Sequence, residues 1–435
     1  MDAVLYGRKS LSGKVRVPGD KSISHRAIMI GSVARGKSSI RGLSKSLDVG
    51  ATLDAFRSIG IKICNEEDET VIDGAGLSGF EGIGEGKRFK IDCRNSGTTA
   101  RLLTGLFSGA GFNAVLTGDT SLKRRPMERV TRPLEEHGAL IETRNGLLPV
   151  VLKGGKLLPI RYTLPVASAQ VKSSLLLASL FIDGMSVIIE PVETRDHTER
   201  MLLLCDAEIK IKNTTRGREI YIKGRRELSA LRMSIPGDIS SAVFFIAAAL
   251  TCPGSELVIE NVGLNPTRAY ILEIFRRMGG NIDVELEEEF PEPVGKLRVR
   301  YSVLRGIKIG GTEIPLIIDE IPALAACAIS ADGDTVVSGA AELRVKESDR
   351  IRGIANLVRS FGGVVEEFKD GFRIKGPVEP IAADVYSSGD HRLAMAASII
   401  ALRVEGKSLI RDAECVDVSF PGFFNILESC AEKCR

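Results

Sequence analysis

Basic residues recur where apolar helices are predicted to begin. Lys21, Arg26, Arg101 and Arg392 each lie in a polar stretch that opens such a helix. Helix N-termini present unpaired backbone N–H groups and a partial positive charge, so they attract anions. Guanidinium groups bind carboxylates and phosphates through paired hydrogen bonds. The pattern predicts a site for small substrates that carry several negative charges.

Two further basic clusters follow predicted strands and precede predicted helices. They are residues 122–127 (LKRRPM) and 344–350 (RVKESDR). Taken alone, the charges of the second cluster are equally consistent with ion pairs three and four residues apart on a helix. Because several such clusters recur, we favour anion binding.

No metal-ligand spacing is visible in the sequence. Its cysteines form no C-x-x-C pair, and its four histidines are far apart. Zinc sites and disulfide frameworks have denser patterns than this. We expect buried, reduced thiols and neither a metal nor another cofactor, so that Arg and Lys would handle the substrate charge.

Composition excludes several classes of partner. The 435 residues include 59 Lys and Arg against 56 Asp and Glu, and no Trp. A net charge of +3 with few aromatic residues does not indicate a nucleic-acid partner. No charge-free apolar stretch reaches the roughly 18 residues of a membrane span, and the N-terminus resembles no signal peptide. We expect a cytoplasmic protein, a monomer, with no nucleic-acid or membrane partner.

One pattern recurs six times along the chain: an apolar helix rich in small residues, a glycine, and a short strand. The glycines are at positions 36, 111, 184, 254, 333 and 406. Helices that are apolar on all sides are buried, so these six should be central. A second, amphipathic helix recurs in the units and should cover the outside. The repeats predict an α/β fold with buried central helices, each followed by a short strand.

A hinge motif divides these six repeats into two lobes. Val17-Pro-Gly-Asp20 returns as Ile235-Pro-Gly-Asp238, which is three repeats later. Pro-Gly pairs mark turns and chain crossings. We therefore predict one lobe at 20–235 and a second at 1–19 plus 236–435, with the active site in the cleft between them.

The segment Gly31-SVAR-Gly36-Lys37-Ser38 fits the phosphate-binding loop of nucleotide hydrolases. That loop needs a strand before it and a helix after it. Here a helix is predicted before it and a strand after it. We interpret it as a structural turn.

Long motifs of this sequence resemble the 5-enolpyruvylshikimate-3-phosphate (EPSP) synthase family along the whole chain. They are GDKSISHR (19–26), NSGTTARL (95–102), RPM (125–127), SAQ (168–170), RDHTER (195–200), RVKESDR (344–350) and DHRLAM (390–395). The resemblance implies two lobes, each of three βαβαββ repeats with buried parallel helices and outer sheets, an inside-out α/β barrel. This agrees with the repeats found independently.

The resemblance also implies an activity. The enolpyruvyl group of phosphoenolpyruvate would be transferred to the 5-hydroxyl of shikimate 3-phosphate, with release of phosphate. This reaction belongs to the shikimate pathway, which leads to chorismate and the aromatic amino acids. No cofactor is implied.

Residue roles follow from the same resemblance, position by position. The residues expected to bind shikimate 3-phosphate are Lys21, Ser22, Arg26, Ser168, Ala169, Gln170, Arg195, Asp319 and Lys346. Those expected to bind phosphoenolpyruvate are Lys21, Gly97, Arg125, Gln170, Arg350 and Arg392. The expected catalytic residues are Asp319, Glu347 and Lys21, with Asp319 as the base for the 5-hydroxyl. Neighbouring cations would keep the two carboxylates ionised.

The sequence departs from the family pattern at several positions. Arg94 stands where a glycine often precedes the Asn, and Ala169 replaces a serine of some members. Val418 stands where some members carry a lysine, and Glu342 where some carry Asn. Gly97 is the residue that leaves room for glyphosate in sensitive members, so we expect inhibition that competes with phosphoenolpyruvate.

Two other functions remain open from the sequence. The first is a UDP-N-acetylglucosamine enolpyruvyl transferase, which shares the fold but uses a cysteine-bearing loop. Neither Cys64 nor Cys93 lies in such a setting. The second is a non-enzymatic polyanion-binding protein, which the small net charge disfavours.

Overall fold

The computed structural model describes residues 2–7 and 9–433. The chain divides into two compact units. We call Gly19–Ile235 the continuous unit, and Met1–Pro18 with Pro236–Arg435 the discontinuous unit. Each is described by itself below.

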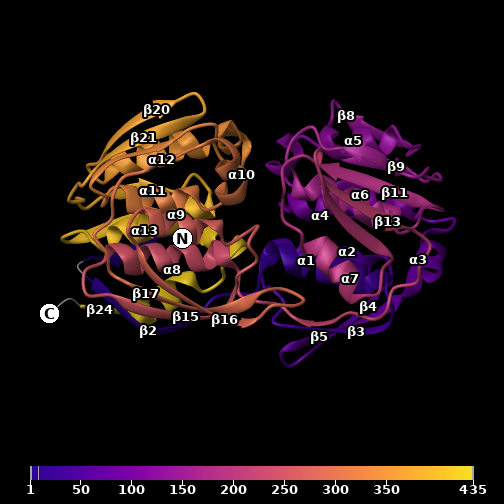
Figure 1. The fold of residues 1–435 in the computed structure, drawn as a ribbon, viewed down its shortest axis with the longest axis horizontal. Helices are drawn as coiled ribbons and strands as arrows, with labels where there is room; N and C mark the ends of the chain where they lie inside the picture. The colour runs from indigo at the N-terminus through magenta and orange to yellow at the C-terminus, as the bar shows by residue number, and fades with distance from the viewer. Residues whose placement is uncertain (1, 8, 434–435) are drawn as a thin grey trace. The chain divides into compact units, whose positions relative to one another are not determined.

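The continuous unit contains three four-stranded sheets with the same arrangement of strands (Figure 1). In each sheet, the strand that begins near the repeat glycine has two neighbours. One is a short parallel strand, and the other is an antiparallel strand that belongs to a hairpin. In order across each sheet, the strands are β14 (Arg232–Ser234), β3 (Arg35–Arg41), β5 (Glu69–Ala75) and β4 (Lys62–Glu66); β6 (Arg88–Asp92), β7 (Asn113–Thr117), β9 (Leu147–Lys153) and β8 (Ile141–Arg144); β10 (Arg161–Thr163), β11 (Met185–Glu190), β13 (Gly217–Lys223) and β12 (Ile209–Thr214).

The discontinuous unit also holds three sheets. Across each sheet, the strands are β16 (Asn281–Glu288), β17 (Val294–Arg300), β15 (Glu256–Gly263), β2 (Lys9–Arg16) and β24 (Ala431–Lys433); β18 (Lys308–Ile309), β19 (Gly333–Val337), β21 (Gly371–Gly376) and β20 (Val364–Phe368); β1 (Ala3–Tyr6), β23 (Lys407–Arg411) and β22 (Asp384–Tyr386).

Strands distant in sequence close each unit. In the continuous unit, β14 comes from the end of the segment and pairs in parallel with β3 at its beginning. In the discontinuous unit, β2 pairs in parallel with β15, and β1 pairs antiparallel with β23. Among the described residues, β23 is followed by no hairpin in its own sheet, and the N-terminal β1 is its antiparallel neighbour.

Six buried helices form the cores of the two units, as predicted. They are α1 (Lys21–Val33), α4 (Gly97–Gly109) and α6 (Ala169–Ser179), then α8 (Ile239–Thr251), α11 (Ile321–Ala328) and α13 (His391–Ala401). Every residue of α8 is buried. Helices α4 and α6 approach closely because Gly105 has no side chain: a Cβ there would lie 2.1 Å from the carbonyl oxygen of Ser174. The inside-out α/β fold is confirmed.

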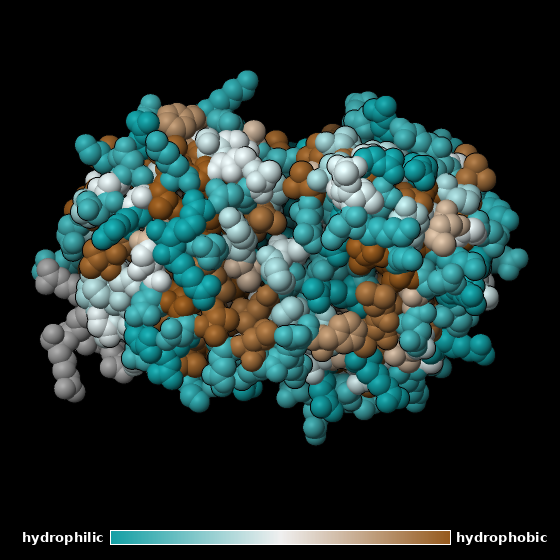
Figure 2. All heavy atoms as spheres, in the orientation of Figure 1, coloured by the Kyte–Doolittle hydropathy of each residue, from teal (hydrophilic) through white to brown (hydrophobic). Residues whose placement is uncertain are grey.

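Amphipathic helices lie toward the outside of the units. They are α2 (Leu47–Ser58), α5 (Glu128–Glu135), α7 (His197–Leu204), α9 (Tyr270–Arg277), α12 (Arg350–Ser360) and α14 (Phe423–Cys430). The shorter helices are α3 (Gly76–Gly84) and α10 (Ile314–Ile317), with 3₁₀ turns η1 (Leu122–Arg124), η2 (Gly311–Glu313), η3 (Ala341–Val345) and η4 (Ala413–Val418). Polar side chains cover most of the face seen in Figure 2, and apolar ones form small groups between them.

The six repeat glycines share one backbone conformation. Their φ angles lie between 71° and 110°, a region that residues with a Cβ rarely adopt. Each glycine lies within two residues of the start of a strand that follows a buried helix. Gly36 follows α1 and lies in β3, so the segment that resembles a phosphate-binding loop is a helix-to-strand turn, as predicted.

We expect Gly36→Ala to lower the free energy of unfolding by about 1–2 kcal/mol. The space around Gly36 is open, so the cost comes from its φ of +95° and not from a clash. Urea denaturation measures it. Gly82→Ala is the matched control, because Gly82 lies in α3 with open space and without a positive φ, and there alanine should stabilise the helix. Equal stability of Gly36→Ala and wild type would contradict this explanation.

The cysteines are largely buried, but the expectation of buried thiols is wrong for Cys64. Cys64 is exposed on β4, and Cys415 is half-buried. Cys434 lies outside the described residues. Within residues 2–7 and 9–433, no group of three or more His, Cys, Asp or Glu side chains could hold a metal ion. Among these residues, no helix is both long and apolar enough to cross a membrane.

Candidate functional site

The structure places the predicted site residues in two groups, one in each unit. The group of the continuous unit contains Lys21, Ser22, Arg26, Gly97, Arg125, Ser168, Ala169, Gln170 and Arg195. The group of the discontinuous unit contains Asp319, Lys346, Glu347, Arg350 and Arg392.

The first group is organised by the N-termini of α1, α4 and α6. Each N-terminus is capped by a side chain that accepts a hydrogen bond from a backbone N–H. Asp20 caps α1, Ser96 caps α4 and Ser168 caps α6. Such caps satisfy one backbone donor each and leave the other N–H groups of the first turn free of partners within the helix. Gly97 and Ala169 are the first residues of α4 and α6.

Two cations on α1 have very different surroundings. The ammonium of Lys21 lies 2.9 Å from a carboxylate oxygen of Asp48. Arg26 is only 2% exposed. It donates hydrogen bonds to the carbonyl oxygen of Ser22, the Ser173 hydroxyl and the Thr198 hydroxyl, at 2.7–2.8 Å. These three acceptors are a carbonyl oxygen and two hydroxyl groups, and they hold the guanidinium group in a fixed position.

Arg101 and Gln170 join α4 to α6. Arg101 donates to the amide oxygen of Gln170 at 2.9 Å, and the amide nitrogen of Gln170 donates to Thr98 at 3.0 Å. A Cβ on Gly97 would lie 2.9 Å from Nη1 of Arg101 and 3.6 Å from Nη1 of Arg125. A glycine at this position therefore leaves open a space beside two guanidinium groups.

Buried hydroxyl groups connect α1 to the cap of α4. Nδ1 of His25 lies 2.7 Å from the Thr52 hydroxyl, which is 2.7 Å from the Thr99 hydroxyl. Thr99 in turn donates to the Ser96 hydroxyl at 2.7 Å. Burial lowers the pKa of His25 to about 3. His25 is thus a neutral part of the scaffold, next to two cations of the site.

We expect the free energy of unfolding to fall between pH 6.5 and about 3 because of His25. In this range the unfolded chain binds a proton that the folded chain does not, so acid destabilises the fold by up to ~1.4 kcal/mol per pH unit. His25→Gln should flatten this slope while keeping a hydrogen bond to Thr52. Urea denaturation at several pH values measures it, with His137→Gln, a half-buried position, as the control. A slope unchanged in His25→Gln would contradict this assignment.

The second group surrounds Asp319, which lies directly before the N-cap of α11. A carboxylate oxygen of Asp319 is 3.4 Å from the ammonium of Lys346 and 3.6 Å from Nη1 of Arg350. Arg392 donates to the carbonyl oxygen of Asp319 at 2.6 Å. Two cations therefore lie next to this carboxylate, and both favour its ionised form.

Arg350 is more enclosed than the sequence indicated. It is 1% exposed and lies 2.8 Å from Asp390 and 2.6 Å from Glu347. Although burial opposes the charge, Asp390 and Glu347 raise the pKa of Arg350. Burial also raises the pKa of Asp390, but the charges of Arg350 and His391 outweigh it and hold the pKa below its ordinary value. Within the described residues, Nη1 of Arg350 donates no hydrogen bond.

Several supporting residues were missed from the sequence. Asp390 caps α13 and binds Arg350, Asp48 pairs with Lys21, and Thr98 binds Gln170. Their contacts join segments that are far apart in the sequence, so no local sequence pattern predicts these contacts. Asp390 is the exception, because its place before a buried helix in an Asp-His-Arg run was a visible cap signal.

The structure explains the arginine at position 94, whose role the sequence left open. Its φ is +50°, a left-handed conformation that favours glycine. Its guanidinium pairs with Asp54 of α2. Arg94 therefore adopts a backbone conformation that is unfavourable for a residue with a Cβ, and its side chain forms an exposed ion pair.

Comparison with known proteins gives one consistent family. The family model described as EPSP synthase (3-phosphoshikimate 1-carboxyvinyltransferase) matches residues 5–427. A 3-phosphoshikimate 1-carboxyvinyltransferase of Pelotomaculum thermopropionicum is 46% identical over 431 residues, 98% of each chain. One of Caldicellulosiruptor bescii is 46% identical over 438 residues, the full length of both chains.

Solved structures agree. EPSP synthase from Acinetobacter baumannii superposes with a TM-score of 0.86 at 39% identity, covering 99% of both chains. The enolpyruvyl transferase NikO from Streptomyces tendae has a TM-score of 0.77 at 18% identity, covering 99% of this chain and 97% of its own, which shows a shared fold alone. With a family model that matches nearly the whole sequence and relatives of almost half-identical sequence, this chain belongs to the EPSP synthase family.

Proposed function

We propose that this protein catalyses the reaction of its family, the transfer of the enolpyruvyl group of phosphoenolpyruvate to the 5-hydroxyl of shikimate 3-phosphate. The hydroxyl loses a proton and its oxygen bonds to the enol carbon, while the methylene carbon gains a proton. The resulting methyl group then loses a proton as the bond to phosphate breaks. The observation that carries the proposal is the Asp319 carboxylate beside Lys346 and Arg350, in a chain of this family.

The first group supplies most of the contacts proposed for shikimate 3-phosphate. Ser22 and Arg26 would bind its phosphate, with Lys21 touching both substrates. The α6 start contributes Ser168, Ala169 and Gln170, and the loop before α7 contributes Arg195. Support comes from the capped helix N-termini and from Arg26, whose guanidinium group is held at the start of α1 by hydrogen bonds to Ser22, Ser173 and Thr198.

For phosphoenolpyruvate we propose Gly97, Arg125, Gln170, Arg350 and Arg392. The space at Gly97 lies beside Arg101 and Arg125. Nη1 of Arg350, which lies 3.6 Å from Asp319 and donates no hydrogen bond within the described residues, could donate one to a substrate carboxylate. Guanidinium groups suit both the phosphate and the carboxylate of this substrate.

Asp319 is the proposed base for the 5-hydroxyl, because neighbouring cations keep a carboxylate ionised and able to accept a proton. Glu347 and Lys21 are the groups proposed to move the proton to and from the methylene carbon. We further propose that the protein acts in the cytoplasm as a monomer.

A phosphate-release assay tests the function directly. Phosphate should appear only when shikimate 3-phosphate and phosphoenolpyruvate are both present, without added metal. Release from UDP-N-acetylglucosamine with phosphoenolpyruvate, and none from the first pair, would overturn the proposal in favour of the sister transferase.

Gly97→Ala should weaken glyphosate inhibition by about 10-fold or more, and it should raise the KM for phosphoenolpyruvate. The new Cβ would approach within 2.9 Å of Nη1 of Arg101, so that side chain must move or the ligand must give way. Steady-state kinetics with phosphoenolpyruvate varied at several glyphosate concentrations measures both. Unchanged inhibition would contradict the steric explanation.

A further inference from the structure

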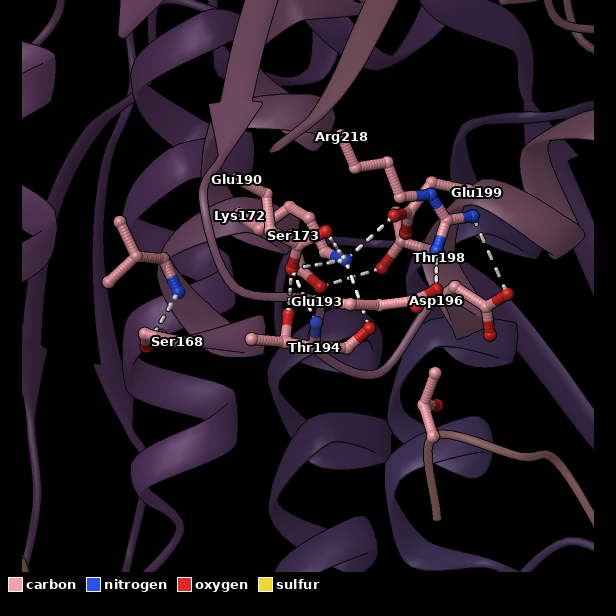
Figure 3. A network of polar contacts seen from close by, with 12 residues as sticks. Ser168, Lys172, Ser173, Glu190, Glu193, Thr194, Asp196, Thr198, Glu199 and Arg218 are labelled. Atoms are coloured by element: carbon pink, nitrogen blue, oxygen red, sulfur yellow. Dashed lines mark hydrogen bonds and ion pairs between the residues drawn. The ribbon is translucent and has the colours of Figure 1, made fainter. Parts of the chain in front are cut away.

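Lys172 is a buried cation that the proposed reaction does not use. It lies on α6, two residues after Gln170, and its side chain is 0% exposed. Its ammonium lies 3.0 Å from Glu190, 2.8 Å from Glu199 and 3.3 Å from the carbonyl oxygen of Thr194 (Figure 3). One side chain therefore touches the end of β11, the following loop and the first turn of α7.

The Glu190 carboxylate extends this contact along the loop. It accepts hydrogen bonds from the backbone N–H of Thr194, at 2.7 Å, and from the Thr194 hydroxyl. On the other side of the loop, Arg218 of β13 pairs with Glu193 and lies 3.7 Å from Asp196 (Figure 3). Arg195 lies between these two anchored stretches, so the loop that carries it is held on both sides.

The same helices also hold Arg26. Thr198 follows the loop on α7 and precedes Glu199; its hydroxyl accepts from Arg26 at 2.8 Å. It donates to Ser173 at 2.7 Å, and Ser173 in turn accepts from Arg26 at 2.7 Å. Lys172 and Glu199 are the direct chain neighbours of Ser173 and Thr198, and they form an ion pair beneath these contacts.

This cluster is a buried group of three ionisable side chains, and burial raises the pKa of Glu190. One ammonium faces two carboxylates, and all three side chains are enclosed. Within the described residues, neither oxygen of Glu199 accepts a hydrogen bond of ordinary geometry, so the charge of Lys172 is what stabilises it. Well-packed apolar side chains at these positions would give the fold at least equal stability. A buried ionic cluster is therefore better explained by its effect on the position of neighbouring residues than by its effect on stability.

Resting on the proposed function, we propose that Lys172 is a positioning residue for shikimate 3-phosphate. Through Glu190, Thr194 and Glu199 it holds the 191–196 loop and the start of α7 against α6, which sets Arg195 and Arg26 at the distances that the phosphorylated substrate requires.

The test is Lys172→Met combined with Glu199→Gln, which keeps the summed formal charge of the cluster unchanged. The KM for shikimate 3-phosphate should rise at least ~10-fold, because small displacements of binding groups have large effects. The KM for phosphoenolpyruvate should change less than about twofold. Leu176→Ala, one turn further along α6 and also buried, is the matched control. It should lower the melting temperature without raising the KM for shikimate 3-phosphate relative to the KM for phosphoenolpyruvate.

A second variant covers the case in which the double variant does not fold. Thr198→Val is nearly isosteric and cuts only the contacts with Arg26 and Ser173. It should give the same selective rise in KM. The inference is overturned if either folded variant keeps the wild-type KM for shikimate 3-phosphate, or if both KM values rise together. Failure of the wild-type protein in the phosphate-release assay would instead reject the proposed function.

Discussion

Asp319→Asn is expected to lower kcat by about 10²–10⁴-fold, the usual contribution of a general base. The amide keeps the size of the carboxylate but accepts no proton from the substrate hydroxyl at neutral pH. The carbonyl oxygen of Asp319, which accepts the hydrogen bond from Arg392, is untouched by the substitution. The KM values should therefore change much less than kcat, and steady-state kinetics separates the two.

Asp334→Asn provides the control for this prediction. Asp334 lies on β19 in the same unit, is exposed, and comes no closer than 3.8 Å to Arg373. Its loss should leave kcat at the wild-type value. If Asp319→Asn kept more than about a tenth of wild-type kcat, another group would have to accept the proton.

Asp390→Asn is expected to lower the free energy of unfolding by about 3–5 kcal/mol, the cost of removing one partner of a buried ion pair. Asp390 accepts from Arg350 at 2.8 Å and caps α13 through the backbone N–H of Arg392. The variant leaves the enclosed Arg350 with Glu347 as its nearest carboxylate. Urea denaturation at pH 7 measures the loss.

This difference should depend on pH with a defined sign. The pKa of Asp390 is held below its ordinary value in the fold. Its contribution is therefore present above the unfolded pKa of about 3.9 and is lost as pH falls through the folded pKa. Wild type and Asp390→Asn should converge in stability under acid conditions. A difference that stayed constant below pH 4 would show that the charge of Asp390 is not the cause.

A double-mutant cycle with Arg350→Met isolates the pair. Because the two residues are in contact, their effects should not add, and the double variant should be more stable than the sum of the single losses implies. Additive losses would indicate that capping of α13, and not the ion pair, accounts for the effect of Asp390→Asn.

The architecture was readable because it is repeated. Six glycines recur after apolar helices, and each adopts the positive φ that ends a helix and starts a strand. Because this steric requirement is local and occurs six times, it can be recognised from the amino-acid sequence alone. The pairing of β1 with β23 was not visible, since it joins the two ends of the chain.

The chemistry of the site was only partly readable. Residue types marked anion binding, because Lys21, Arg26 and Arg392 stand at helix starts, where charge and backbone donors act together. The partners of these cations were hidden: Arg26 binds neutral hydroxyls, whereas Arg350 is surrounded by carboxylates. Identical side chains thus serve different purposes according to what folding brings next to them.

Local rules therefore specify which residues can cap, turn or carry charge, since these properties depend on neighbours within a few positions. The groups that each cation contacts lie tens to hundreds of residues away in the sequence, as with Arg26 and Thr198 or Arg350 and Asp390. Electrostatic energy falls with distance and rises with burial, so only the folded arrangement of helices α1, α6, α7, α12 and α13 could decide these contacts.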